Sequence, residues 1–157
     1  MNTQYDSDFF ISPIFRQRLS DLISESNYKR AELPKKIGVS KDIIIRSLNM
    51  GILPSTKSLI KIADFFSVSI EYLLGLTDSE IFVKLEPPTT FQIRIIELKE
   101  QNSVSYFEIA SSLGFSRSLF TSWKKFDYIP SLEILYIISR YFNVSIDYLL
   151  GRTDDRN

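Results

Sequence analysis

The sequence predicts an all-α protein that consists of two similar five-helix domains joined by an extended linker. Two observations support this. The chain contains a long internal repeat, and each copy of the repeat contains short stretches of helical periodicity that begin at capping residues and end at glycine or before proline. Neither copy contains a convincing strand pattern, so the expected secondary structure is helical throughout.

The repeat is clearest in two segments, SVSIEYLLGLTD at 67–78 and NVSIDYLLGRTD at 143–154. They lie 76 positions apart, and the same offset holds without a gap over residues 15–78 and 91–154. Other matching pairs are Phe15 and Phe91, Arg18 and Arg94, Gly38 and Gly114, Ser40 and Ser116, and Pro54 and Pro130. This period is too long for a solenoid and fits two whole small domains of about 64 residues each.

The expected organisation is an N-terminal arm at 1–13, a first domain at 14–78, a linker at 79–89 and a second domain at 90–157. The pair Pro87-Pro88 excludes a helix from the linker. Its IFVKL stretch, 81–85, is either a short strand or an exposed extended segment. This segment, or the arm with its apolar cluster Phe9-Phe10-Ile11, could join two chains into a homodimer.

In the second copy, the expected helices cover 91–101, 106–113, 117–125, 132–142 and 146–150. The residues expected to cap them are Thr89 or Thr90, Ser105, Ser116, Ser131 and Ser145. Gly114 and Gly151 are expected to end two of these helices in the left-handed conformation. The first copy predicts helices at 14–26, 30–37, 41–49, 56–66 and 70–74. The residues expected in the core are Ile109, Leu113, Phe115, Phe120, Leu135, Ile138 and Phe142, with Trp123 half-buried.

Composition excludes several classes of protein. The 157 residues include no cysteine and no histidine, which removes disulfides, thiolate chemistry and the commonest general base and metal ligand. No phosphate-binding loop or convincing pair of carboxylates is present, so no enzyme, metal or cofactor is expected. No apolar run is long enough to cross a membrane, and the acidic start does not match a secretory signal. The expected location is the cytoplasm.

Two short helices joined by a glycine turn, as at 106–113 and 117–125, match the helix-turn-helix arrangement. The second copy contains SYFEIASSLGFSRSLFTSW followed by PSLEILYIISRYFNVSIDYLLG. In these segments it resembles the Cro/C1 (XRE-type) DNA-binding family. The first copy resembles it through AELPKKIGVSKDIII and LPSTKSLIKIADFFSVSIEYLLG. The resemblance covers both copies, and it implies lambda-repressor-like domains that bind double-stranded DNA as a bacterial or phage-type repressor.

The first copy departs from the family pattern in helix two, where Pro34 replaces the usual alanine and predicts a shortened or shifted helix. A second departure affects both copies. The family usually has an acidic residue after the aromatic residue of helix three. In this chain that position holds Leu48 in the first copy and Lys124 in the second. Arg18 and Arg94, its expected partners on helix one, therefore need other partners or face solvent.

The resemblance places most of the candidate DNA-contacting residues on helix three or directly beside it, and one in each copy at the start of helix two. In the second copy these are Tyr106, Ser116, Arg117, Ser118, Thr121, Ser122 and Lys125. In the first copy they are Arg30, Ser40, Lys41, Asp42, Ile45, Arg46 and Asn49. Arginine can bind guanine through two hydrogen bonds, and serine and threonine can bind several base edges. Ile45 could meet a thymine methyl group or belong to the core.

Basic charge is concentrated where DNA would bind, although the whole chain has no net charge. Residues 29–50 hold six basic and two acidic residues, and residues 105–126 hold three and one. The alternative is a protein-interaction module in which one or both copies no longer read DNA. Pro34, Asp42, the aliphatic run at 43–45 and the zero net charge favour this alternative.

If both copies bind DNA, their different reading residues predict a site with two unlike halves. Half-sites of such proteins lie about 34 Å apart, and the linker can span at most about 36–40 Å when fully extended. Because the two copies account for most of the chain, no small-molecule ligand is expected.

Overall fold

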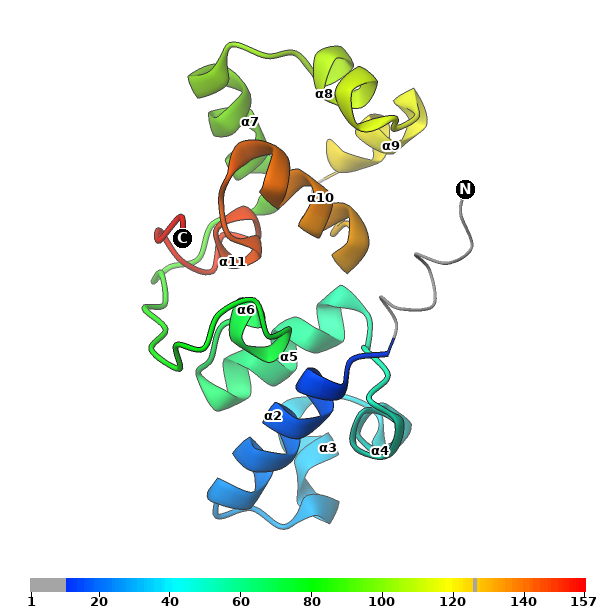
Figure 1. Ribbon diagram of the computed structural model, residues 1–157, viewed down its shortest axis with the longest axis vertical. Coiled ribbons are helices and arrows are strands. Elements are labelled where there is room, and N and C mark those ends of the chain that lie inside the picture. Colours follow the sequence, from blue (N-terminus) through cyan, green and yellow to red (C-terminus); the bar gives the residue numbers. More distant parts are fainter. Residues whose placement is uncertain (1–10, 126) are drawn as a thin grey trace. The chain divides into compact units, whose positions relative to one another are not determined.

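The computed structural model describes residues 11–125 and 127–157. Within these residues the chain is helical, and its only β interaction is an isolated antiparallel bridge between Ile11 and Ile52 (Figure 1). The expectation of an all-α protein is therefore confirmed. The chain separates into two compact units, unit 1 ending at Phe82 and unit 2 beginning at Val83. Phe9 and Phe10 of the predicted apolar arm lie outside the described residues.

The helices lie where the sequence predicts them, to within two residues at each end. Unit 1 contains α2 (Pro13–Glu25), the 3₁₀ helix η1 (Arg30–Glu32), α3 (Leu33–Ile37), α4 (Lys41–Met50), α5 (Thr56–Phe66) and α6 (Ile70–Leu73). Unit 2 contains α7 (Phe91–Asn102), α8 (Tyr106–Leu113), α9 (Arg117–Trp123), α10 (Leu132–Phe142) and α11 (Ile146–Leu149). The starts of α4, α5 and α6 precede those of α9, α10 and α11 by the 76 residues of the sequence repeat.

Most of the predicted caps form. The side chains of Thr90, Ser105, Ser131 and Ser145 each accept a hydrogen bond from the amide three residues later. These bonds satisfy amides that have no partner inside the helix, and so fix where each helix begins. Pro34 has the predicted effect, because the second helix of unit 1 is divided into η1 and α3 with Pro34 in the first turn of α3. A missing amide is tolerated in a first turn.

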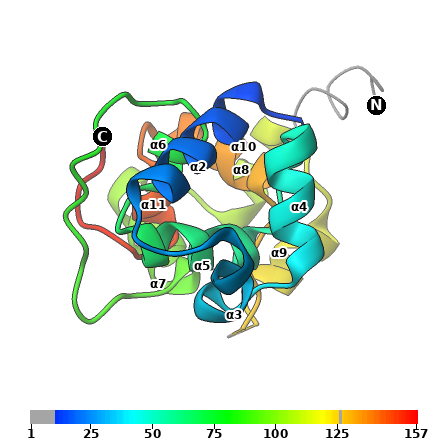
Figure 2. The same cartoon turned by 90° about the horizontal axis from the view of Figure 1, so that it is seen from below.

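Each unit has its own core. In unit 1, α2 packs against α4 and α6 (Figure 2). Phe15, Leu19 and Leu33 are fully buried. In unit 2, Ile109, Phe120, Leu135 and Ile138 are buried as predicted, whereas Leu113, Phe115 and Phe142 are only half-buried. Trp123 was expected to be half-buried but is fully buried. The difference arises because the last turn of α9 inserts its indole among Phe91, Phe115 and Phe120.

The two helix-one arginines close their units against the repeated C-terminal phrase. In unit 2, the Arg94 guanidinium donates to the carboxylate of Asp154 at 2.6 Å and to the carbonyl of Thr153 at 3.1 Å, and it lies 4.1 Å from the centre of the Tyr148 ring. These contacts join the first helix to the last segment, across 60 residues of chain.

Unit 1 repeats this arrangement with matching residues. Arg18 donates to the carbonyls of Tyr72 and Thr77 and to the carboxylate of Asp78, and it lies 4.3 Å from the centre of the Tyr72 ring. The repeated Tyr-Leu-Leu-Gly-x-Thr-Asp phrase therefore supplies the partners that the arginines need in place of the missing acid. Its tyrosines and first leucines are buried, as expected for an element that closes the fold.

The second half of the predicted linker is bound to the C-terminal segment of unit 2. Leu85 donates through its amide to the carbonyl of Arg152 at 2.8 Å, and the Thr153 hydroxyl donates to the carbonyl of Val83 at 2.7 Å. The IFVKL stretch forms no strand in the described structure. Ile81 and Val83 are highly exposed, which fits the alternative of an exposed extended segment.

Gly151 and Gly114 offer a matched pair for testing how tightly unit 2 is closed. Both have positive φ, +72° and +70°. A Cβ atom at Gly151 would collide with the backbone carbonyl of Thr89, whereas one at Gly114 would meet no atom within 4 Å. We expect Gly114→Ala to destabilise unit 2 by about 1–2 kcal/mol through backbone strain alone. Gly151→Ala should destabilise it by about 1–3 kcal/mol more because of the collision.

Urea unfolding of the full-length variants, followed by the fluorescence of the single tryptophan in unit 2, measures this difference. Equal midpoints for the two variants would show that the segment at Thr89 does not pack against Gly151.

Candidate nucleic-acid interface

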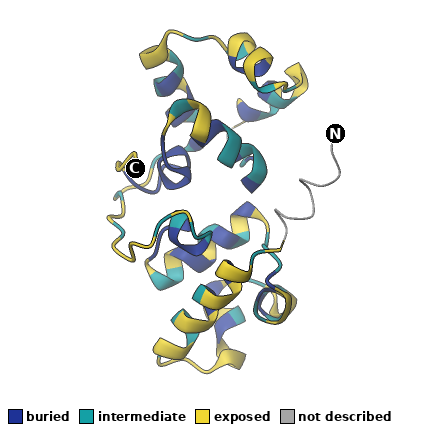
Figure 3. Ribbon diagram, viewed as in Figure 1, coloured by how far each residue is buried: buried dark blue, intermediate teal, exposed yellow. Residues whose placement is uncertain are grey.

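In unit 1, the turn between α3 and α4 presents the outer face of α4 to solvent. Gly38 ends α3 with φ of +86°, and the Ser40 hydroxyl caps α4 by accepting from the amide of Ile43. Ile44, at 2% exposure, fixes the inner face of α4 in the core. Both buried and exposed positions occur along the helices of this unit (Figure 3). The exposed positions of α4 and of the turn before it carry most of the residues predicted to read DNA in unit 1, namely Ser40, Lys41, Asp42, Arg46 and Asn49.

The aliphatic run at 43–45 does not form the exposed surface that would favour a protein partner. Ile44 is buried, and Ile43 and Ile45 are half-buried, because successive residues of a helix point in different directions. This corrects one of the observations that favoured a protein-interaction module. Ile45 remains partly accessible beside Arg46 and Asp42.

Two predicted site residues from different helices lie together in unit 1. Arg30, the first residue of η1, donates to the side-chain oxygen of Asn49 near the end of α4, at 3.3 Å. Both residues are exposed, so the bond links the start of the second helix to the end of the third at the surface.

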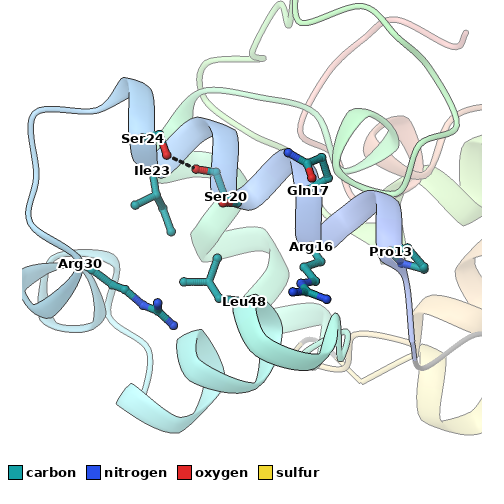
Figure 4. Close-up of a pocket in the computed structure, with 8 residues that line it drawn as sticks. All are labelled: Pro13, Arg16, Gln17, Ser20, Ile23, Ser24, Arg30 and Leu48. Atoms are coloured by element: carbon teal, nitrogen blue, oxygen red, sulfur yellow. Dashed lines mark hydrogen bonds between the residues drawn. The ribbon is translucent and has the colours of Figure 1, made fainter.

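A pocket of about 580 Å³ lies beside this bond, between α2 and α4 (Figure 4). It is lined by Pro13, Arg16, Gln17, Ser20, Ile23, Ser24, Arg30 and Leu48. Figure 4 shows the guanidinium groups of Arg16 and Arg30 on either side of Leu48. The lining contains two cations and no carboxylate, so it suits an anionic group. The sequence pattern did not single out Arg16, because its position in this pocket depends on how α2 packs near Arg30.

In unit 2, Gly114 turns the chain between α8 and α9, and the exposed face of α9 carries Arg117, Ser118 and Thr121. Ser116 occupies the position before α9 but does not cap it. Its hydroxyl is instead 2.9 Å from that of Ser118, which corrects the expectation of a cap. Both hydroxyls are exposed, so this pair stands at the start of α9 with hydrogen-bonding capacity left for another group.

The hydroxyl groups of two further predicted residues donate hydrogen bonds to backbone carbonyls within α9. Thr121 donates to the carbonyl of Arg117 at 3.4 Å, and Ser122 donates to the carbonyl of Ser118 at 3.3 Å. Each hydroxyl oxygen can still accept a hydrogen bond, and rotation of the hydroxyl can redirect the proton. Thr121 is exposed, whereas Ser122 is half-buried. Lys125, also exposed, lies in the turn that follows α9.

The ring of Tyr106, at the start of α8, lies close to two lysines. The ammonium of Lys99 lies 3.6 Å from the centre of its ring, and that of Lys124 lies 5.2 Å away. Burial raises the pKa of the Tyr106 hydroxyl, which therefore remains protonated and able to donate at neutral pH. The neighbouring Glu108 completes a capping box, and its bond from the Ser105 amide lowers the pKa of its carboxyl.

A metal site is not evident in residues 11–125 and 127–157, where no three acidic side chains are gathered. None of the described helices has the length and apolar character needed to cross a membrane.

Comparison with known proteins gives one informative relationship. Over 62 residues, the chain is 31% identical to the HTH-type transcriptional regulator YobD of Bacillus subtilis (strain 168). The aligned residues make up 40% of this chain and 55% of that protein, so the chain spans about half the length of its relative. The aligned length is close to that of one sequence repeat. No family model and no solved structure matches the chain.

Proposed function

We propose that this protein is a sequence-specific regulator of transcription, most simply a repressor, that binds double-stranded DNA. Each unit acts as a lambda-repressor-like helix-turn-helix domain, with α4 and α9 as the helices that enter the major groove. The observation that carries the proposal is the same in both units. A tight glycine turn leads into a helix whose apolar face is buried in the core of its unit. The other face of this helix is exposed and carries basic or hydroxyl side chains.

The relationship to YobD supports the same conclusion, because that protein is described as a helix-turn-helix regulator of transcription. The chain is proposed to act by binding and not by catalysis. Because α4 presents Lys41, Asp42 and Arg46 where α9 presents Arg117, Ser118 and Ser122, the two units are proposed to read unlike half-sites.

Phosphate contacts are assigned to the cations beside the reading helices. In unit 1, the pocket between Arg16 and Arg30 suits a phosphate of the DNA backbone. In unit 2, Lys125 follows α9 directly, and the protonated Tyr106 hydroxyl can donate to a phosphate. Such contacts position a protein on DNA but carry no sequence information by themselves.

Salt dependence tests whether these cations bind phosphate. If Arg16, Arg30 and Lys125 each neutralise one phosphate, the logarithm of the binding constant should fall with the logarithm of salt concentration with a slope of about −3. Fluorescence anisotropy of a labelled duplex measures this slope. Arg16→Ala should reduce it by about 1, whereas Arg140→Ala, at the end of α10, should leave it unchanged. Equal affinity at low and high salt would contradict the proposal.

A further inference from the structure

Phe107 is an exposed aromatic residue beside the proposed reading helix of unit 2. It lies in the first turn of α8, and 60% of its surface is accessible. The guanidinium carbon of Arg117, the first residue of α9, lies 5.5 Å from the centre of its ring. The Phe107 ring and the Arg117 guanidinium therefore stand together near the N-terminal ends of α8 and α9.

The contact affects both side chains. A guanidinium near the face of an aromatic ring is attracted to it and loses part of its rotational freedom. Among the described residues, Phe107 is the side chain that contacts the Arg117 guanidinium, so Phe107 restricts its position. In return, Arg117 covers only part of the ring, and most of Phe107 remains available for another apolar group.

Unit 1 has no equivalent of this pair. At the matching positions, 76 residues earlier, it has Ala31 and Lys41. Neither an aromatic ring nor a guanidinium is present there, although Gly38 makes the same turn between the two helices as Gly114. The pair is therefore a property of unit 2 and not a requirement of the turn.

We propose that Phe107 and Arg117 together read a thymine next to a guanine in the half-site of unit 2. This inference rests on the proposed function. In the major groove, guanine offers O6 and N7 to an arginine, and thymine offers its C5 methyl group to an apolar side chain such as phenylalanine. Because the ring and the guanidinium are in contact, the two bases that they meet are neighbours. Phe107 is thus a specificity-determining residue.

Replacing thymine with uracil in the bound duplex tests this inference, because it removes only the C5 methyl group. The duplex is first selected by the protein, and each thymine beside a guanine is then replaced in turn. For the unsubstituted protein, uracil at one such position should weaken binding about three- to fivefold, as expected for the loss of one buried methyl contact.

The same replacement should have no effect on Phe107→Ala, which lacks the ring, and a reduced effect on Phe107→Leu, which keeps an apolar side chain. Both variants should fold, since the residue is exposed. The matched control is uracil in the half-site of unit 1, where Phe107→Ala should change nothing. The inference is overturned if no uracil weakens binding, or if the effect is equal in the unsubstituted protein and in Phe107→Ala. Those two outcomes leave DNA binding intact, whereas failure to bind any duplex would overturn the proposed function as well.

Discussion

Replacing Arg46 and Arg117 together with alanine should lower the affinity for a selected duplex by about a thousandfold or more, to the level of non-specific binding. Each residue is exposed on the outer face of its helix, in α4 and α9. A bidentate contact to guanine contributes about 1–3 kcal/mol of discrimination, so each single substitution should weaken binding by roughly 5- to 150-fold. Anisotropy titrations of the two single variants and the double variant measure these effects.

Substitution by lysine separates base reading from simple charge. Lysine keeps the positive charge but lacks the planar fork that binds two acceptors at once, so Arg46→Lys and Arg117→Lys should retain the salt slope and lose specificity. Arg140→Ala serves as the control for a general loss of cationic charge. Unchanged affinity in the double variant would show that neither helix reads DNA.

The single variants also test the alternative that only one unit binds DNA. If Arg117→Ala abolishes binding while Arg46→Ala has no effect, unit 2 binds DNA alone and unit 1 has a different partner. Pro34 and the exposed carboxylate of Asp42 are the features of unit 1 that favour this alternative. If both single substitutions weaken binding, both units contribute to recognition.

Trp123→Ala should unfold most of unit 2. The side chain is fully buried, its ring centre is 4.2 Å from that of Phe120, and it meets Phe91 edge-on at 5.5 Å. Removal of a buried tryptophan side chain destabilises a protein by about 3–5 kcal/mol. A unit of this size has a total stability of roughly 4–11 kcal/mol, so the loss is a large fraction of it.

Hydrogen exchange on the full chain can locate this effect. Amides of α8 to α11 should lose protection in Trp123→Ala, and amides of α2 to α6 should keep it, because each unit has its own core. Trp123→Phe is the matched variant, since it keeps an aromatic ring. It also removes the indole N–H, which has no hydrogen-bond partner among the described residues. Loss of protection in both units together would show that they do not unfold independently.

The helices were predictable from the sequence because their signals are local. A serine or threonine before a helix accepts a bond from an amide only three residues away, as Thr90 and Ser105 do. Pro34 acts on its own turn, and the shortening of the second α-helix to Leu33–Ile37 was predictable for the same reason. The outward position of Arg46 and Arg117 also follows from the helical period once the opposite face is known to be apolar.

The features that the sequence did not predict depend on contacts between distant segments. Arg18 and Arg94 bind an aspartate 60 residues away, and both members of each pair were visible in the repeat without any sign that they meet. The cap at Ser116 failed because its hydroxyl pairs with that of Ser118. The contact of Phe107 with Arg117 could not be foreseen, because it requires the angle between α8 and α9.

Selection of duplexes from a random pool by the purified full-length protein tests the central claim most directly. A sequence-specific regulator with two unlike reading helices should enrich a motif with two different halves, one of which contains a thymine beside a guanine. Sequencing of the bound fraction after several rounds reads out the motif and the spacing of its halves. A bound fraction with no sequence preference over the starting pool would contradict the account.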